Sequence, residues 1–235
     1  MSSSVIVVAA DRFAATAATW IADRANSAIE ARGECTLALC GGNTPVPVFE
    51  ELVGRSIRWP EVVVFFGDER AVPRDDPDSN FGMACRSLLD HVSIRGDRVH
   101  RMEADRPDRA VAAEEYDRLL PPRLDILLLG VGPDGHTASL FPGSPALLET
   151  DRRVVAVPGP PPPIQPQLAR MTITPPVIGA ARNVAVLVSG IAKAALLARI
   201  LEGPPDPITL PAQFARRGTW ILDRAAAGQL HRRDD

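Results

Sequence analysis

Cysteine is scarce in this sequence, and its spacing supports neither a disulfide framework nor a zinc site. The three cysteines, Cys35, Cys40 and Cys85, make an odd number and include no CxxC pair. No apolar run approaches the length of a membrane helix, and the amino terminus lacks the basic start and long apolar core of a secretory signal. We therefore expect a cytoplasmic protein with no membrane partner.

An excess of positive charge is also missing. The formal net charge is −3 at pH 7, so the chain has no basic field that would attract nucleic acid. We expect no nucleic-acid partner, and any anionic ligand must be bound by individually placed cations. With 46% hydrophobic and 23% charged residues over 235 positions, the composition is that of a globular protein able to bury a large core.

Lysine is almost absent. Lys193 is the single lysine among 26 lysine and arginine residues. Because arginine serves at every other basic position, one compact and rotatable ammonium suggests a task that a guanidinium would not perform. The alternative is that one surface lysine remains by chance.

Apolar runs alternate with helical patterns along the whole chain. We predict strands at 5–10, 36–40, 61–66, 98–102, 124–129, 154–157, 183–188 and 220–223, and helices at 11–33, 46–53, 80–89 and 108–120, after 175 and up to 201. This alternation predicts the α/β class. The expected fold is a single domain, 1–235, with a doubly wound, largely parallel sheet and helices on both faces, a modified Rossmann-like architecture.

Several residues have the chemistry of helix caps. Asp11 precedes the first helical pattern, and Thr44 stands before the second, with Pro45 in its first turn. Ser79 or Asn80 is placed to cap the third helix. These positions predict where the helices begin.

The stretch 124–143 is the most informative part of the sequence. The buried strand at 124–129 breaks into a turn that contains Gly130 and Gly132, and this turn carries Asp134 and His136. Ligands of open α/β sheets bind at the carboxyl ends of strands. A carboxylate beside an imidazole fixes its tautomer and raises its basicity. Although Asp-Gly is also an ordinary turn pair, the coincidence of strand, turn and acid–base pair predicts an active-site loop.

A second glycine turn points to a phosphate. Gly41, Gly42, Asn43 and Thr44 connect a buried strand to a helix amino terminus, where free N–H groups and the helix dipole favour an anion. The string is neither a Walker loop nor a GxGxxG motif, and such turns also serve as simple connections. The position of Lys193 in the first turn of a helix is a second, independent indication of an anion.

Charged residues follow the third strand as well. Asp68 and Arg70 come directly after it, at the ligand edge of the predicted sheet. The acidic loop at 74–80 is not a calcium loop, because Phe81 stands where glycine is needed and Ser87 where glutamate is needed. We therefore expect a solvated acidic loop rather than a calcium site.

Together these motifs resemble the 6-phosphogluconolactonase family, within the wider glucosamine-6-phosphate isomerase/deaminase superfamily. The matching strings are CGGNTP at 40–45, GDERAVP at 67–73 with SN at 79–80, 125–143, RMTIT at 170–174, SGIAKA at 189–194 and WILD at 220–223. They run in family order over nearly the whole chain, and GPDGHTASLFPG is highly specific.

The resemblance implies hydrolysis of 6-phospho-D-glucono-1,5-lactone to 6-phosphogluconate, the second step of the oxidative pentose phosphate pathway, by a monomer without cofactor or metal. It implies that His136 is the general base that activates water, with Asp134 beside it. For the phosphate it implies Lys193, Arg170 and the turn formed by Gly41, Gly42, Asn43 and Thr44, with Asp68 and Arg70 also lining the pocket.

Two features depart from the family pattern. Asn43 stands where the family usually has serine, which removes a hydroxyl but leaves the backbone N–H groups that would bind phosphate. The segment 158–166 is richer in proline than usual and therefore stiff. It is either a rim or lid beside the site or a structural excursion.

Other functions fit less well. Amino-sugar phosphate deaminases carry Asn-Glu-Pro after the His segment, whereas residues 139–142 read Ser-Leu-Phe-Pro and supply no glutamate. A non-catalytic sugar-phosphate sensor would need a DNA-binding unit, for which we expect no room before the first motifs near residue 40, and would be expected to lose the Asp134–His136 pair.

The reaction chemistry leaves two points open. Ser139 is a rival nucleophile, but it lies three residues after His136 and has no GxSxG elbow. The oxyanion of a tetrahedral intermediate needs hydrogen-bond donors, and Arg70 or a backbone N–H of the glycine turn are the candidates.

Overall fold

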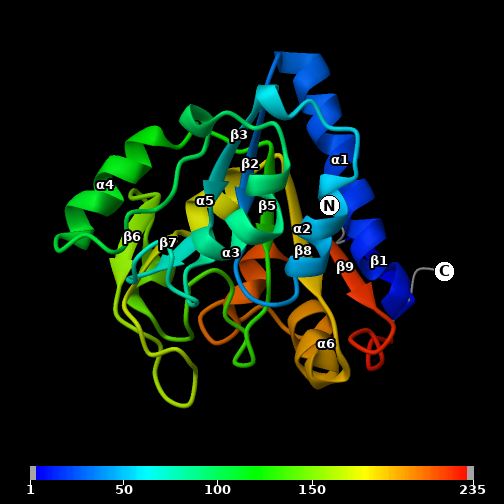
Figure 1. Cartoon of the computed structure of the whole chain (residues 1–235). Coiled ribbons are helices and arrows are strands. Elements are labelled where there is room, and N and C mark those ends of the chain that lie inside the picture. Colours follow the sequence, from blue (N-terminus) through cyan, green and yellow to red (C-terminus); the bar gives the residue numbers. More distant parts are fainter. Residues whose placement is uncertain (1–3, 232–235) are drawn as a thin grey trace.

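A six-stranded parallel sheet forms the centre of the molecule. The structure, a computed structural model, describes residues 4–231, so the outer ends of the predicted domain 1–235 lie outside it. The strands are β1 (Ser4–Val8), β2 (Cys35–Leu39), β3 (Val62–Phe66), β5 (Ile126–Leu129), β8 (Asn183–Val188) and β9 (Thr219–Asp223). Their order across the sheet is β1-β9-β8-β5-β2-β3 (Figure 1). The predicted α/β fold with a parallel sheet is confirmed.

Helices cover both faces of this sheet. On one face α1 (Phe13–Arg32), α2 (Val46–Val53) and α3 (Asn80–Ser87) pack in succession, and α5 (Pro175–Ala180) lies behind the sheet (Figure 1). Helix α6 (Ala194–Glu202) follows β8, and α4 (Arg109–Leu119) packs against β6 (Val154–Val157). Short 3-10 turns occupy Ala10–Arg12, Trp59–Glu61, Leu89–His91, Gly96–Arg98, Pro145–Leu148, Ile191–Lys193 and Pro211–Ala215.

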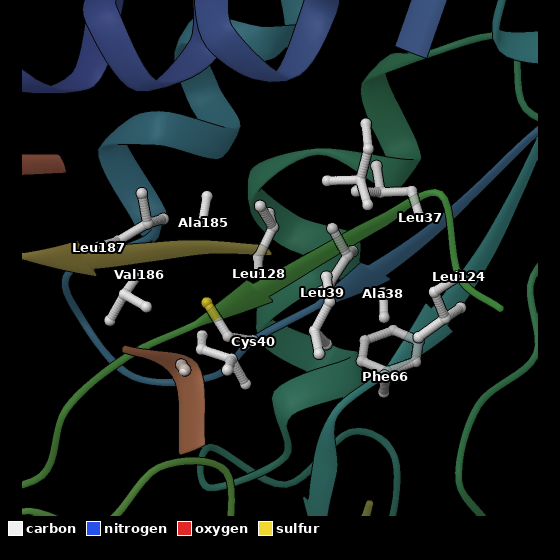
Figure 2. Packing of buried hydrophobic residues seen from close by; sticks show 14 of the residues in the cluster. Leu37, Ala38, Leu39, Cys40, Phe66, Leu124, Leu128, Ala185, Val186 and Leu187 are labelled. Carbon is white, nitrogen blue, oxygen red and sulfur yellow. The ribbon is translucent and has the colours of Figure 1, made fainter. Parts of the chain in front are cut away.

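The core lies between the sheet and these helices. Strands β2 and β5 are buried along their whole length, as expected for central parallel strands covered on both faces. Figure 2 shows Leu39, Leu128 and Leu187 among the side chains that β2, β5 and β8 contribute. Because these apolar side chains fix the central strands, the turns at their carboxyl ends start from a rigid base.

A second, antiparallel sheet was not predicted. It has the order β4-β7-β6, in which β4 is Asp68–Arg70 and β7 is Arg170–Ile173. Only the β6 segment was expected to be a strand. In the register of β4 and β7, Asp68 lies opposite Thr172 and Arg70 opposite Arg170. This small sheet therefore brings residues that are a hundred positions apart in the sequence to one place.

The strand predicted at 98–102 is wrong. Gly96–Arg98 is a 3-10 turn, and only Val99 forms a β-bridge, with Val64. The N–H of His100 donates to the carbonyl of Val64 at 2.9 Å, after which the chain leaves the edge of the sheet. A single contact with β3 cannot establish a strand.

Two predicted caps are also wrong. Asp11 lies inside a 3-10 turn, and α1 begins after Arg12 without a side-chain cap. Helix α2 begins after Pro45, and Thr44 makes no capping bond. In both places the backbone enters the helix through residues already in helical conformation, so no side-chain oxygen is in position to cap.

The cap at Ser79 is confirmed. Its Oγ accepts the N–H of Gly82 at 3.0 Å and donates to Glu69 at 3.1 Å. We expect Ser79→Ala to lower the free energy of unfolding by about 1 kcal/mol, because the first turn of α3 loses its acceptor. Urea unfolding measures the change. Ser144→Ala, which removes the cap of a four-residue 3-10 turn, is the control and should cost less. Equal stability of Ser79→Ala and the unchanged protein would contradict this assignment.

Candidate active site

A cavity of about 680 Å³ lies at the carboxyl edge of the parallel sheet. The chain passes from β2 to β3 toward one edge of the sheet and from β5 through β8 to β9 toward the other, so the turns after β2 and β5 diverge. This switch point is where open α/β sheets leave a crevice for ligands. Turns that follow β2, β3, β5 and β8 line the cavity.

All ten residues singled out from the sequence line this one cavity. They are Gly41, Gly42, Asn43, Thr44, Asp68, Arg70, Asp134, His136, Arg170 and Lys193. They come together because parallel strands end at the same edge, and because β4 and β7 add the residues of the second sheet.

The pair Asp134–His136 is formed. Nδ1 of His136 lies 2.5 Å from Oδ1 of Asp134, which also accepts the backbone N–H of His136 at 3.1 Å. Burial of the Asp134 carboxyl opposes its ionisation, but the hydrogen bond and charge of His136, together with backbone donors, outweigh it and lower the pKa of Asp134. The carboxylate thus fixes Nδ1 as the protonated nitrogen and leaves Nε2 as the basic one.

Close packing fixes the imidazole ring. A Cβ on Gly132 would lie 2.0 Å from Cε1 and 2.1 Å from Nδ1 of His136, so only glycine fits there. On another side the ring makes an edge contact with Phe141, with centroids 4.8 Å apart. The orientation of His136 is therefore set by its neighbours before any ligand binds.

Arg170 is a deeply buried cation. Its side chain is 4% exposed, and Nη2 donates to the carbonyl of Pro166 at 2.9 Å. The nearest carboxylate, that of Asp68, is 3.9 Å from Nη1, and Nε has no hydrogen-bond partner among residues 4–231. Burial lowers the pKa of Arg170, and Asp68 acts in the opposite direction. An anion in the cavity would complete the environment of this guanidinium.

Asp68 is occupied by protein donors. Oδ2 accepts the hydroxyl of Ser139 at 2.6 Å, and Oδ1 accepts Nδ2 of Asn80 at 3.1 Å. Its carboxylate lies beside Arg170, and the Asp68 side chain is 9% exposed. It therefore connects the His136 loop, α3 and β7 at the wall of the cavity, and direct binding of a substrate by Asp68 stays a prediction.

Two further cations face the cavity. Arg70 donates through Nη1 to the carbonyl of Asp78, and its Nε has no partner within the described chain. The side chain of Lys193 forms no ion pair or hydrogen bond with any residue between 4 and 231. Burial lowers the pKa of Lys193, and Asp134 partly offsets the effect. Lys193 ends a 3-10 turn and directly precedes α6, so it lies just before the helix rather than in its first turn.

The glycine turn after β2 also lines the cavity. A Cβ on Gly41 would lie 1.9 Å from Oδ1 of Asn80, and Gly42 has a φ of +92°. Both positions therefore require glycine, for different reasons: a close approach at Gly41 and a left-handed backbone at Gly42. Asn43 and Thr44 complete the turn before α2.

Some lining residues were not named as site residues, although several belong to the predicted active-site turn or to the proline-rich segment 158–166. They are Cys40, Pro45, Asn80, Gly130, Val131, Gly132, Pro133, Ala138, Pro163, Ile164, Gln165, Leu187 and Val188. Those next to strand ends could have been found from their position after an apolar run. Asn80 stood out only as a possible helix cap and in the family string at 79–80, because its approach to Gly41 depends on how α3 packs. Residues 163–165 show that the proline-rich segment contributes to the rim, one of the two interpretations of its sequence.

Within the part of the chain that the structure describes, no group of three or more His, Cys, Asp or Glu side chains could hold a metal ion. No helix there is both long and apolar enough to cross a membrane. The cavity offers cations, backbone donors and one carboxylate–imidazole pair.

Fold and site together define a doubly wound α/β protein with a cation-lined cavity and a preformed acid–base pair at its switch point. The chain belongs to the family described as glucosamine-6-phosphate isomerases/6-phosphogluconolactonase, whose sequence model matches residues 9–222. Its relatives include the 6-phosphogluconolactonase of Mycobacterium tuberculosis, 40% identical over 98% of this chain and 99% of the relative, and that of Synechocystis, 39% identical over 89% and 90%.

Solved structures agree with this placement. The 6-phosphogluconolactonase of Trypanosoma brucei superposes with a TM-score of 0.87 at 31% identity, covering 97% of this chain and 99% of that one. The Thermotoga maritima 6-phosphogluconolactonase gives 0.83 at 28% identity, with 94% and 100% covered. A monomeric glucosamine-6-phosphate deaminase gives 0.82 at 22% identity, with 96% and 99% covered, which shows a shared fold only.

Proposed function

We propose that this chain hydrolyses 6-phospho-D-glucono-1,5-lactone to 6-phosphogluconate. The observation that carries the proposal is the preformed Asp134–His136 pair in a cavity that also holds Arg70, Arg170 and Lys193. A base that activates water and separate cations for a phosphate are the two requirements of this reaction. The 6-phosphogluconolactonases among the relatives at 36–40% identity support the choice of substrate.

The chemistry needs no covalent enzyme intermediate. Nε2 of His136 takes a proton from water, whose oxygen attacks the lactone carbonyl carbon to give a tetrahedral intermediate. When the intermediate collapses, the bond from this carbon to the ring oxygen breaks, and the ring oxygen takes up the proton that the His136 imidazolium carries, which restores the neutral imidazole. Asp134 stabilises the imidazolium that forms in between. The oxyanion needs donors, for which Arg70 and the backbone N–H groups of the glycine turn are the candidates.

Phosphate binding falls to the other groups of the cavity. Within residues 4–231, the side chain of Lys193 forms no hydrogen bond or ion pair, and Nε of Arg170 has no hydrogen-bond partner. The turn 41–44 precedes the amino terminus of α2. These features suit a dianion. Binding energy from the phosphate, which does not react, can hold the lactone carbonyl against the water and His136.

Two alternative chemistries find less support. The hydroxyl of Ser139 is fully buried and donates to Asp68, so it has no free path to a substrate and no adjacent imidazole as its base. For the deaminase reaction, residues 139–142 supply no glutamate beside the His136 loop. We further propose that residues 1–235 act as one domain, as a cytoplasmic monomer and without a cofactor, as the family resemblance implies.

Substitution of Lys193 should separate binding from chemistry. We expect Lys193→Gln to raise KM for the phosphorylated lactone by about 10- to 100-fold, because a charge-assisted bond to the phosphate is lost. The KM for unphosphorylated glucono-1,5-lactone should change little. Lys193→Arg keeps the charge, so its KM for the phosphorylated lactone should lie between the KM of the unchanged protein and that of Lys193→Gln. Equal losses on both lactones would show that Lys193 does not bind the phosphate.

The proposal is tested by supplying freshly generated 6-phosphogluconolactone to the unchanged protein and subtracting spontaneous hydrolysis. Glucosamine 6-phosphate is assayed in parallel for ammonia release. Lactone hydrolysis well above the spontaneous rate, without ammonia, is the expected result. Ammonia release without lactone turnover would place the chain with the deaminases instead.

A further inference from the structure

Ala138, two residues after His136, has a backbone conformation that is unusual for alanine. Its φ is +47°, and it is the one non-glycine residue with positive φ among those described. Such conformations are strained for residues with a Cβ, and they persist where the surroundings hold them. Ala138 lines the cavity, so the strain lies next to the proposed base.

Both neighbours of Ala138 are fixed by hydrogen bonds. Thr137 donates its hydroxyl to the carbonyl of Gly130 at 2.9 Å. Ser139 is held twice: its N–H donates to Oγ1 of Thr172 at 3.0 Å, and its hydroxyl donates to Oδ2 of Asp68 at 2.6 Å. Ser139 is fully buried, so water does not compete for these bonds. Strands β4 and β7 of the second sheet thus hold the His136 loop through hydrogen bonds to Ser139, the residue directly after Ala138.

We propose that Ser139 is a positioning residue for His136. Its two anchors on Thr172 and Asp68 keep Ala138 in the left-handed conformation, and this holds the imidazole of His136 at its place in the cavity. Without the hydroxyl, the strained turn can relax and carry His136 away from the water and the lactone carbonyl. The inference rests on the proposed lactone hydrolysis and assigns a task to a serine that is not the nucleophile.

The hydrogen bond between Ser139 and Asp68 also connects the His136 loop to the buried cation Arg170. Oδ2 of Asp68 accepts from Ser139 and lies 3.9 Å from Nη1 of Arg170. Asp68 therefore fixes the loop of the base and the buried cation relative to one another. A substrate held by its phosphate at Arg170 meets His136 in the right place only if this link is intact.

Ser139→Ala tests the proposal, with Ser87→Ala as the matched control. Ser87 is also a buried serine, but its hydroxyl donates to the carbonyl of Met83 within α3, away from the cavity. We expect kcat of Ser139→Ala to fall by about 10- to 100-fold with KM changed less than threefold, because a misplaced base affects the reaction step. Ser87→Ala should keep kcat even if it loses thermal stability.

Relief of the strain provides a second readout. Glycine adopts positive φ without a Cβ clash. With glycine at position 138, the turn should therefore keep its conformation even when the hydrogen bond from Ser139 to Asp68 is missing. Ala138→Gly combined with Ser139→Ala should recover several-fold of the lost kcat. A serine that matters only for stability would give no such recovery per folded molecule.

Thr172→Val removes the acceptor of the Ser139 N–H, and it replaces Ser139→Ala as the test variant if Ser139→Ala does not fold. A kcat within twofold of the unchanged protein in whichever variant folds would overturn the positioning role and leave the lactonase proposal standing. Failure of the unchanged protein itself to hydrolyse the lactone would overturn both.

Discussion

Gly132→Ala is expected to lower kcat for lactone hydrolysis by about 100-fold or more, although the substitution adds a single methyl group. That methyl group would lie 2.0 Å from Cε1 of His136 and 2.1 Å from Nδ1, far inside contact distance. The ring must rotate away, and it then loses its bond to Asp134 and its contact with Phe141. The loss should therefore approach that of removing the imidazole.

Gly179→Ala is the matched control for this substitution. Gly179 lies in α5, outside the cavity, and a Cβ there would meet no atom within 4 Å. Alanine in a helix interior should raise stability by up to about 1 kcal/mol and leave kcat unchanged. A Gly132→Ala protein with normal kcat would show that the observed orientation of His136 is not the one used in the reaction.

The second large effect is expected for His136→Ala. Loss of the proposed general base should reduce kcat by about 10²- to 10⁴-fold, with a smaller change in KM, because we propose that other groups bind the phosphate. His91→Ala is the control, since His91 is exposed, does not line the cavity, and its ring is hydrogen-bonded to the carbonyl of Arg86. Steady-state rates with the spontaneous hydrolysis subtracted measure both. Normal kcat in His136→Ala would remove the general base from the mechanism without affecting family membership.

The central sheet could be predicted from the sequence because its strands are uniform apolar runs. Strands β2, β5 and β8 are buried on both faces, and such burial leaves an apolar run that is readable in isolation. The strand β4 could not be found in this way. Asp68–Arg70 is three charged residues, and it becomes a strand only because β7 pairs with it across a hundred positions.

The predicted site residues line one cavity for a similar reason. Asp134, Lys193 and the turn 41–44 each follow a strand end, and all strands of the sheet end at the same edge. Asn80 and the strained Ala138 were missed as parts of the site: Asn80 was considered only as an alternative cap of α3 and in the family string at 79–80, and a backbone angle cannot be read from the sequence. Glu69 was also missed: it is buried and accepts the N–H groups of Asn80 and Phe81 at the start of α3. Nothing in the string GDER separates its role from that of Asp68.

Chemical rescue of His136→Ala tests the central claim, water activation by the imidazole, most directly. Lactone hydrolysis by this variant would be followed with increasing imidazole, and the rates without enzyme at each concentration would be subtracted. Our account predicts a strongly reduced rate that rises with imidazole and saturates as the vacated space beside Asp134 fills. An unreduced rate in the variant, or a reduced rate that imidazole does not raise while lactone binding is intact, would contradict the assignment of His136 as the base.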